Sequence, residues 1–388
     1  MRCRLRRRLQ AFTIIGYNTR MTQRIETNLQ TVHSEAPVST QSITEYSPDN
    51  RLLKEIEQDG RAWVIGVYTD QLKAWKQTWK SNRLGEGKNQ TTNARLRTDQ
   101  DLLLTEGCIF QTQSLSQNID GSPLFSDLNG PMNSDVDNQS GIGFFPCSQE
   151  IIVGNLKTGL IENRITHPIF NDLHSVSLNR KTNTILVVSS GADMIVEIDR
   201  NGQLLWQWDA SVFADKYGLI DDAIKQRRSD LVDTSDYRKW VVPTPAQTTH
   251  INTATWLNEK QIGVTLFHQG IALVVDKESG DANIILRGLI KPHGFQPTRD
   301  GRFVVTSTGQ GKILILDDGF QLSESITGFF DNHPVGEISW IHTSFPVDGK
   351  ILAVDQTLAE LIILDTQNRR IQRIKHSDDW KVSFVGRV

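Results

Sequence analysis

The sequence repeats a pattern of short apolar runs and polar turns, and this repeat limits what the chain can fold into. Four segments align on it, and in each the second apolar run ends in aspartate before a tight turn and a third run. They cover residues 184–208, 261–286, 302–326 and 350–374. Repeats of roughly 40–50 residues with several strands each are typical of β-propeller blades. One blade cannot bury both faces of its sheet, so blades must stack around an axis.

The repeat therefore predicts an all-β protein, a β-propeller of six blades, with five to seven left open. Residues 150–166 are interpreted as the last two strands of an earlier blade, whose front strands we expect around residues 102–112. Residues 61–68 are a further strand candidate. The ending at 380–388 could close the ring by joining the first blade, which would remove exposed sheet edges.

The chain divides into a leader with a flexible arm at 1–50, an extension at 51–100 and the propeller at 101–388. The extension is expected to be partly helical: residues 50–60 and 70–84 both place apolar side chains at helical spacing, with a pair of strands as the alternative for 70–84. Whether it contributes to the first blade is left open. Two insertions are expected in the propeller. One is a loop-like stretch at 113–142, rich in Ser, Asn, Asp and Gly, and the other is a helix-like stretch at 210–246.

Composition excludes several classes of function. The 42 basic and 45 acidic residues nearly balance, so no basic surface for nucleic acid is expected. No run of eighteen apolar residues exists, so no membrane span is expected. Three cysteines without metal-type spacing favour a reducing, cytoplasmic location. The arginine-rich residues 1–24 leave export or organelle targeting as an alternative, and translation from Met21 as another.

Four histidines fall in register with the repeat, each just before an expected strand. They are His174, His250, His293 and His342, at intervals of 76, 43 and 49 residues. The first strand of a propeller blade lines the central channel, so these imidazoles would form a ring near one mouth. Such a ring could bind a divalent metal such as Zn or Fe(II). It could equally act as acid, base or nucleophile, or only stabilise the starts of the blades.

Other polar residues fit the same repeat. The aspartates that end the second run of each segment are predicted to make hairpin turns with the residues that follow; they are Asp199, Asp276, Asp317 and Asp365. Two pairs of polar residues each precede one of these four histidines and are expected on loops at the rim of the channel. They are His167 with Asp172 and His333 with Glu337. Arg238, in the second insertion, could clamp an anion or belong to a solvated run of charges.

Residues 150–376 resemble propellers of the NHL and arylsulfotransferase-like groups. The resemblance rests on the phrases "NDLHSVSLNRKTNTILVVSSGADMIVEIDRNGQLLWQWD", "THINTATWL" and "KPHGFQPTRDGRFVVTSTG". In the arylsulfotransferase-like family a channel histidine accepts the sulfuryl group, assisted by other histidines and an arginine. The resemblance implies that His174, His250, His293 and His342 take these roles here, with Arg238 as the arginine.

Two functional hypotheses follow. In the first, the chain is an enzyme that acts on a small anionic or aromatic substrate, by sulfuryl-transfer-like or metal-assisted lyase or hydrolase chemistry. Its ligand lies at the channel mouth, and its cofactor, if it has one, is a divalent metal. In the second, the chain is a non-catalytic scaffold whose histidines are structural. Its protein partner would then bind the loops at 113–142 and 210–246.

Overall fold

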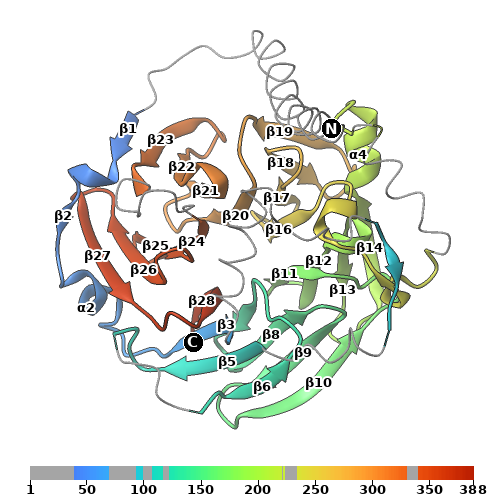
Figure 1. Cartoon of the computed structure of the whole chain (residues 1–388), viewed down its shortest axis with the longest axis horizontal. Helices are drawn as coiled ribbons and strands as arrows, with labels where there is room; N and C mark the ends of the chain where they lie inside the picture. The colour runs from blue at the N-terminus through green and yellow to red at the C-terminus, as the bar shows by residue number, and fades with distance from the viewer. Residues whose placement is uncertain are drawn as a thin grey trace, which may run out of the picture. The chain divides into compact units, whose positions relative to one another are not determined.

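The computed structural model describes residues 39–69, 93–98, 107–116, 122–220, 222, 234–329 and 340–388. Thr40–Val388 form one compact unit. Within it, six antiparallel sheets surround a common axis, which makes a six-bladed β-propeller (Figure 1). The predicted fold class is therefore confirmed. The expected leader at 1–24, the helix at 70–84 and the pair His333 and Glu337 lie outside the described residues.

Each blade has four strands, which follow one another from the axis to the outside of the ring. In order from the innermost strand, blade 1 is β28 (Lys381–Arg387), β3 (Trp63–Tyr68), β5 (Gly107–Thr112) and β6 (Phe125–Leu128); blade 2 is β7 (Asp135–Asp137), β8 (Ile142–Cys147), β9 (Glu150–Asn155) and β10 (Leu160–Thr166); blade 3 is β11 (Leu173–Asn179), β12 (Thr184–Ser189), β13 (Met194–Ile198) and β14 (Leu204–Asp209); blade 4 is β16 (Ile251–Trp256), β17 (Gln261–Leu266), β18 (Ile271–Asp276) and β19 (Ala282–Leu286); blade 5 is β20 (Pro292–Pro297), β21 (Phe303–Ser307), β22 (Lys312–Leu316) and β23 (Leu322–Thr327); and blade 6 is β24 (Ile341–Val347), β25 (Lys350–Asp355), β26 (Glu360–Asp365) and β27 (Arg370–Lys375). Blades 3 to 6 contain the four aligned repeats.

The ring is closed by the last strand of the chain. β28 pairs antiparallel with β3, so blade 1 combines the C-terminal strand with strands from the start of the propeller. Val382, Phe384 and Val385 of β28 are buried between blade 1 and its neighbours. The strand predicted at 380–388 and its closing role are both confirmed.

Two corrections concern the N-terminal half. Residues 39–48, expected to belong to a flexible arm, form β1 (Ser39–Ser42) and β2 (Ser47–Pro48), joined by the 3₁₀ turn η1 (Ile43–Glu45). β1 adds to the outer edge of β23, and β2 adds parallel to β27. The arm sequence has no strand periodicity of its own, and the pairing covers two edges that blades 5 and 6 would otherwise expose. The predicted helix follows as α2 (Leu52–Ile56).

The stretch 113–142 was expected to be a loop, and this is wrong for part of it. It contains β6 and β7 and the first residue of β8, which supply the outer strand of blade 1 and the front of blade 2. The range 102–112 contains β5, which belongs to blade 1 and not to the front of blade 2. β6 and β7 are only four and three residues long and rich in aspartate and serine. Neighbouring strands hold them in place, and their own propensity for strand is weak.

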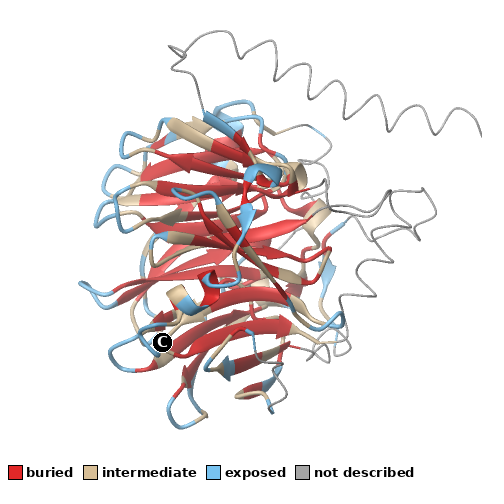
Figure 2. Cartoon of the chain, turned by 90° about the vertical axis from the view of Figure 1, so that its left-hand side faces the viewer, coloured by how far each residue is buried: buried red, intermediate tan, exposed pale blue. Residues whose placement is uncertain are grey.

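The hydrophobic core lies between the blades. The second strands β12, β17, β21 and β25 are buried along almost their whole length, because adjacent blades cover both faces. Buried residues fill the interior of the sheets, while the turns at their ends are exposed (Figure 2). This explains why these strands appear in the sequence as continuous apolar runs without alternation.

Hydroxyl side chains link the innermost strands. The backbone N–H groups of Ala254 and Trp256 in β16 donate to Ser175 Oγ and Ser177 Oγ of β11, at 3.2 and 3.3 Å. The N–H of Gly294 in β20 donates to a hydroxyl of β16 in the same way, at 3.0 Å. These bonds fix the heights of neighbouring blades along the axis, and thereby the positions of the residues that precede them.

The second insertion lies between β14 and β16. It contains α4 (Ala210–Lys216), the 3₁₀ turns η4 (Tyr237–Lys239) and η5 (Thr244–Ala246), and β15 (Trp240–Val241), which pairs with β4 (Arg95–Leu96). The predicted helical character is confirmed for α4, which begins after Asp209, whose carboxylate accepts the N–H groups of Ser211 and Val212.

Candidate functional site

The innermost strands share an irregularity at one end. β11, β16, β20, β24 and β28 each have a break in register with their neighbour near their start. The breaks fall at residues 174, 252, 294, 342 and 383. A β-bulge bends the strand locally and redirects side chains, and bulges are common beside functional sites. This end of the axis is therefore the part of the propeller in which side chains are re-aimed.

The structure brings together all four histidines that the repeat placed in register. His174 and His250 have ring centroids 4.6 Å apart, and those of His293 and His342 are 4.7 Å apart. Phe267 connects the two pairs, with its ring 4.7 Å from that of His250 and 5.7 Å from that of His293. All four imidazoles are buried. Four blades thus contribute to one continuous row of rings.

Hydrogen bonds fix the tautomer of three of these rings. Nδ1 of His174 lies 2.9 Å from the carbonyl oxygen of Asp172, and Nδ1 of His293 lies 2.9 Å from that of Lys291. Nδ1 of His250 lies 2.5 Å from Oε1 of Gln247. Carbonyl oxygens only accept hydrogen bonds, so each Nδ1 carries the proton and each Nε2 keeps a lone pair. This is the arrangement by which proteins orient histidines that ligate metals.

The two backbone carbonyls have the same local geometry. Asp172 and Lys291 each have φ of 51°, in the left-handed region, and each precedes its histidine by two residues. A non-glycine residue seldom adopts this conformation. Here it turns the carbonyl back toward the imidazole, so two blades repeat one device for orienting a histidine.

Burial keeps three of the histidines neutral. It holds the pKa of His250 and of His342 well below the usual value and lowers the pKa of His293 to about 3. Neighbouring histidines and lysines act in the same direction. At neutral pH these rings therefore carry no extra proton to donate and are weak bases, but each keeps a lone pair that can bind a metal or attack an electrophile.

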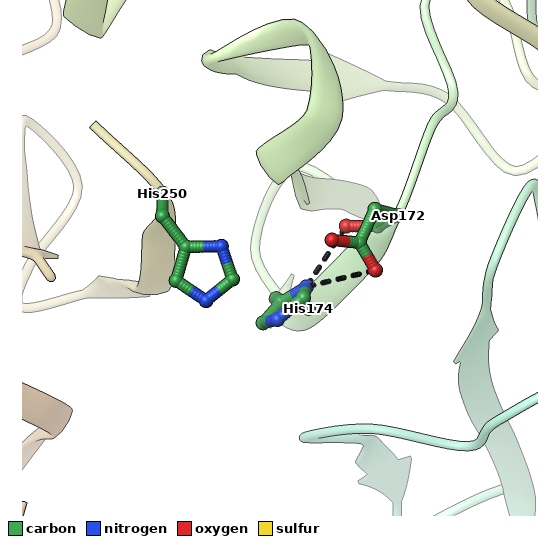
Figure 3. Close-up of side chains that lie close together, drawn as sticks. All are labelled: Asp172, His174 and His250. Carbon is green, nitrogen blue, oxygen red and sulfur yellow. Dashed lines mark hydrogen bonds and ion pairs between the residues drawn. The ribbon is translucent and has the colours of Figure 1, made fainter. Parts of the chain in front are cut away.

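One acidic residue joins the row. The carboxylate of Asp172 lies beside His174, with Oδ1 3.7 Å from Nδ1 (Figure 3). Its Oδ2 accepts a hydrogen bond of 2.7 Å from Nε2 of Gln247. One ligand atom from each of Asp172, His174 and His250 can be chosen so that all three lie within 4.8 Å of one another. Two imidazoles and one carboxylate in such proximity fit a divalent transition metal.

Two lysines bring positive charge to the same end of the axis. Nζ of Lys291 lies 5.7 Å from the ring centre of Phe267 and 5.4 Å from that of Trp340. Nζ of Lys381, at the start of β28, lies 5.2 Å from the ring centre of Tyr68. Burial lowers the pKa of both lysines to about 8, and Asp172 partly opposes this at Lys381. Both remain mostly charged at neutral pH, next to aromatic faces that attract cations.

Arg238 does not contribute to this row. Its guanidinium binds the carboxylate of Asp236, with Nε 2.8 Å from Oδ1, and its Nη1 donates to Thr166 Oγ1 at 3.2 Å. These contacts place it on the outer strand of blade 2, so the role implied for it by the resemblance is not supported. Of the expected rim pair His167 and Asp172, the aspartate joins the histidines. The ring of His167 packs near Phe170, with centroids 5.9 Å apart.

Sequence reasoning missed the residues that position His250. Asp193 is fully buried, and its carboxylate accepts hydrogen bonds from the backbone N–H groups of Thr248, Thr249 and His250, at 2.9, 2.7 and 3.2 Å. Asp193 has φ of 55° and lies at the turn between the second and third strands of blade 3. The equivalent turns of blades 4, 5 and 6 have Gly270, Gly311 and Ala359, which also have positive φ. An aspartate at a turn position where the other blades have glycine or alanine was the sequence signal that could have identified this residue.

The turn aspartates behave as predicted. In each, a side-chain oxygen accepts backbone N–H groups of the turn that follows, which confirms their role in making turns rather than in chemistry. The bonds run from Asn201 and Gln203 to Asp199, from Glu278 and Ser279 to Asp276, from Gln321 to Asp317 and from Asn368 to Asp365.

No family model matches the sequence, and no curated protein matches it significantly. Solved structures do match. A chain in the crystal structure of a nidogen/laminin complex is 9% identical, with a TM-score of 0.51 over 84% of this chain and 97% of that one. A virginiamycin B lyase from Staphylococcus aureus, solved as a catalytically inactive variant with quinupristin, is 12% identical, with a TM-score of 0.47 over 71% and 85%. A streptogramin B lyase structure gives 12% and 0.44 over 67% and 80%.

These similarities extend to the fold alone. Fold and strand order define the chain as a six-bladed β-propeller. In the described part of the chain, no helix is long and apolar enough to cross a membrane. What the site does must be argued from its residues, because propellers host many unrelated functions.

Proposed function

We propose that the protein is an enzyme with a divalent metal bound by Asp172, His174 and His250, and that it performs metal-assisted lyase or hydrolase chemistry on a small anionic substrate. The observation that carries this proposal is the fixed tautomer of the two histidines. Both donate Nδ1–H to a carbonyl oxygen, which leaves a lone pair on Nε2, and one ligand atom of each lies within 4.8 Å of a carboxylate oxygen of Asp172. Proteins orient metal-ligating histidines by the same kind of hydrogen bond at the other ring nitrogen.

The residues of the chain have distinct parts in this proposal. Gln247 connects two of the ligands, because its Oε1 accepts from His250 and its Nε2 donates to Asp172. Lys291 and Lys381 hold the anionic group of the substrate, because both bring positive charge to the histidines. Phe267 and Trp340 form walls that exclude water and strengthen these electrostatic contacts. A divalent metal polarises a substrate oxygen and makes bound water more acidic.

Sulfuryl transfer is less well supported. Neutral His293 or His342 could accept a group, but the family's arginine has no counterpart in Arg238, which is bound to Asp236. The alternative of a non-catalytic scaffold is also less well supported, because it places a protein partner on two loops, and one of them, 113–142, supplies strands to blades 1 and 2. We therefore prefer the metal site, and a small-molecule ligand over a protein partner.

Metal binding tests the proposal directly. We expect one Co²⁺ or Zn²⁺ per chain after dialysis, measured by elemental analysis and, for Co²⁺, by visible absorption. His174→Ala and His250→Ala should each weaken binding by about 100-fold or more, because a three-ligand site loses a ligand. His167→Ala is the matched control and should bind as the parent does. Stoichiometric metal in the His174→Ala, His250→Ala double variant, or none in the folded parent, would refute the site.

The two lysines predict how anion binding depends on pH. An ammonium with a pKa of about 8 is charged below that pH and neutral above it, so the affinity for sulfate should fall between pH 7 and pH 9 by about tenfold for each lysine that holds the anion. Isothermal titration calorimetry on the metal-free protein would measure this. Lys381→Gln should weaken binding at pH 7 and flatten the profile. An affinity that stays constant from pH 7 to pH 9 would show that these lysines do not hold the anion.

A further inference from the structure

A cavity of about 590 Å³ opens at the other end of the inner strands. The histidines lie at the starts of these strands, whereas the cavity is bounded by their last residues and by the turns that follow, such as 297–300 and 347–350. A strand advances about 3.3 Å per residue, so the mouth of the cavity lies roughly 15–20 Å from the histidines. The cavity reaches inward as far as Asn133, Ser175 and Thr253, so its inner end lies next to the backbone of His174.

The mouth of this cavity carries more positive than negative charge. Six cationic side chains line it, from Arg61, Arg180, Arg299, Arg302, Lys350 and Arg387, against three carboxylates, from Asp135, Asp300 and Asp348. Asp348 alone is shared by three arginines, with N–O distances of 2.9 Å to Arg299, 2.9 Å to Arg387 and 3.6 Å to Arg61.

The remaining partners of these cations stand behind the wall. Glu55 binds Lys350, Glu324 lies near Arg302, and Asp59 binds Arg61 and Arg387, and none of these three carboxylates is part of the lining. Within the lining, Asp135 binds Arg180 at 3.1 Å and Asp300 binds Arg302 at 2.8 Å, so the lining itself has more cations than carboxylates although each cation has an ion-pair partner. Guanidinium groups offer several N–H donors each and suit carboxylate or phosphate oxygens.

The inner end of the cavity offers a hydrogen-bond acceptor. Asn133 is 6% exposed, and its Oδ1 has no hydrogen-bond partner among the residues that the structure describes. A buried amide oxygen without a donor is costly, so a ligand that donates an O–H there is favoured. The hydroxyls of Ser175 and Thr253 accept backbone N–H groups of the next blade and can still donate. This end therefore suits hydroxyl groups.

We propose that this cavity is a second binding site, entered from the end of the axis opposite to the histidines, for a small polyhydroxylated anion. Its carboxylate or phosphate lies at the arginine-lined mouth, and its hydroxyl groups reach Asn133. The volume is in the range of pockets for small ligands. Ion pairs that join blades 1, 5 and 6 explain why Asp348 is shared. They do not explain the unpartnered oxygen of Asn133 at the inner end.

Calorimetry with three related probes tests this proposal: glucose 6-phosphate, gluconate and glucose. We expect one or both anions to bind and neutral glucose not to bind, and which anion binds identifies phosphate or carboxylate as the group recognised. Arg299→Gln should weaken binding by about five- to tenfold. Arg164→Gln, which removes an equally ion-paired arginine on the outer strand of blade 2, should leave binding unchanged. Failure of both anions to bind at 10 mM, a concentration of about the weak limit for such ligands, would overturn the proposal.

A second variant separates the two ends of the proposed site. Asn133→Ala should weaken glucose 6-phosphate binding by about fivefold and leave inorganic phosphate binding unchanged, because phosphate alone has no hydroxyl to place there. If Asn133→Ala weakens the binding of glucose 6-phosphate and of inorganic phosphate equally, Asn133 does not bind a hydroxyl group of the ligand. Anion binding that is lost in His250→Ala but kept in Arg299→Gln would place the ligand at the histidines and refute a second site. None of these experiments depends on metal binding, so the proposed anion site and the proposed metal site can be refuted independently.

Discussion

Deletion of residues 380–388 is expected to unfold the propeller at room temperature. The deletion removes β28, the innermost strand of blade 1, and leaves β3 with an open edge. It also exposes the partners of Val382, Phe384 and Val385, which are buried in two separate clusters between blades. Burying three such side chains contributes about 5–8 kcal/mol, which is comparable to the whole stability of a domain. Circular dichroism and gel filtration would detect the loss of the fold.

A single substitution in β28 tests the same prediction in a protein that stays folded, so that the loss of stability can be measured. Phe384→Ala retains the strand but removes a side chain that is only 4% exposed, so the free energy of unfolding should fall by about 3–5 kcal/mol in urea titration. Val212→Ala, at a site 64% exposed, should change it by less than about 0.5 kcal/mol. A deletion variant that still unfolds in one cooperative transition at the parent's midpoint would show that closure by β28 is not what holds the ring together.

The features of the fold that were best predicted from the sequence are those that every blade repeats. Blades 3 to 6 each follow their neighbour in the chain, so the same order of strand, turn and aspartate recurs and the four histidines fall at one height. The prediction of a row was possible because every blade rotates about the same axis. Once His174 and His293 begin equivalent strands, their distance is set by the geometry of the blades rather than by anything in their local sequence.

Blades 1 and 2 could not be predicted in this way, for a physical reason. Blade 1 is assembled from both ends of the propeller, with β28 beside β3, so no contiguous repeat exists. The first strand of blade 2, β7, has only three residues, Asp135–Asp137. Its place is set by Asp135, whose Oδ2 accepts the N–H of Leu178 in β11 at 2.8 Å. A contact across 43 residues leaves no local pattern in the sequence.

The chemistry of the site depends on residues from outside the repeat. Lys381 comes from the closing strand and Gln247 from the insertion before blade 4, so neither belongs to the four aligned repeats. The electrostatic character follows from burial: it keeps His250, His293 and His342 neutral but leaves most of the charge on the lysines, because the ordinary pKa of lysine is four units higher. The site thus combines neutral ligand atoms with cations, which suits a metal and an anion together.

Asp193→Ala is expected to have the largest effect of any single substitution near the site. The carboxylate is fully buried, and its removal leaves the N–H groups of Thr248, Thr249 and His250 without this acceptor. Each such loss costs about 1–3 kcal/mol, and alanine is also strained at a φ of 55°. The free energy of unfolding should therefore fall by about 3–5 kcal/mol in urea titration, close to the limit that a folded protein tolerates.

The same substitution should also weaken metal binding, because Asp193 fixes the backbone from which His250 extends. Asp193→Asn separates the two effects. Asparagine tolerates the left-handed conformation and keeps one acceptor oxygen, so this variant should remain folded while its affinity for Co²⁺ falls by about 10- to 100-fold. Asp199→Ala, at an exposed turn of the same blade, is the control for both measurements. If Asp193→Asn binds Co²⁺ as tightly as the parent does, His250 is not held in place by this carboxylate and the proposed chain of positioning residues fails.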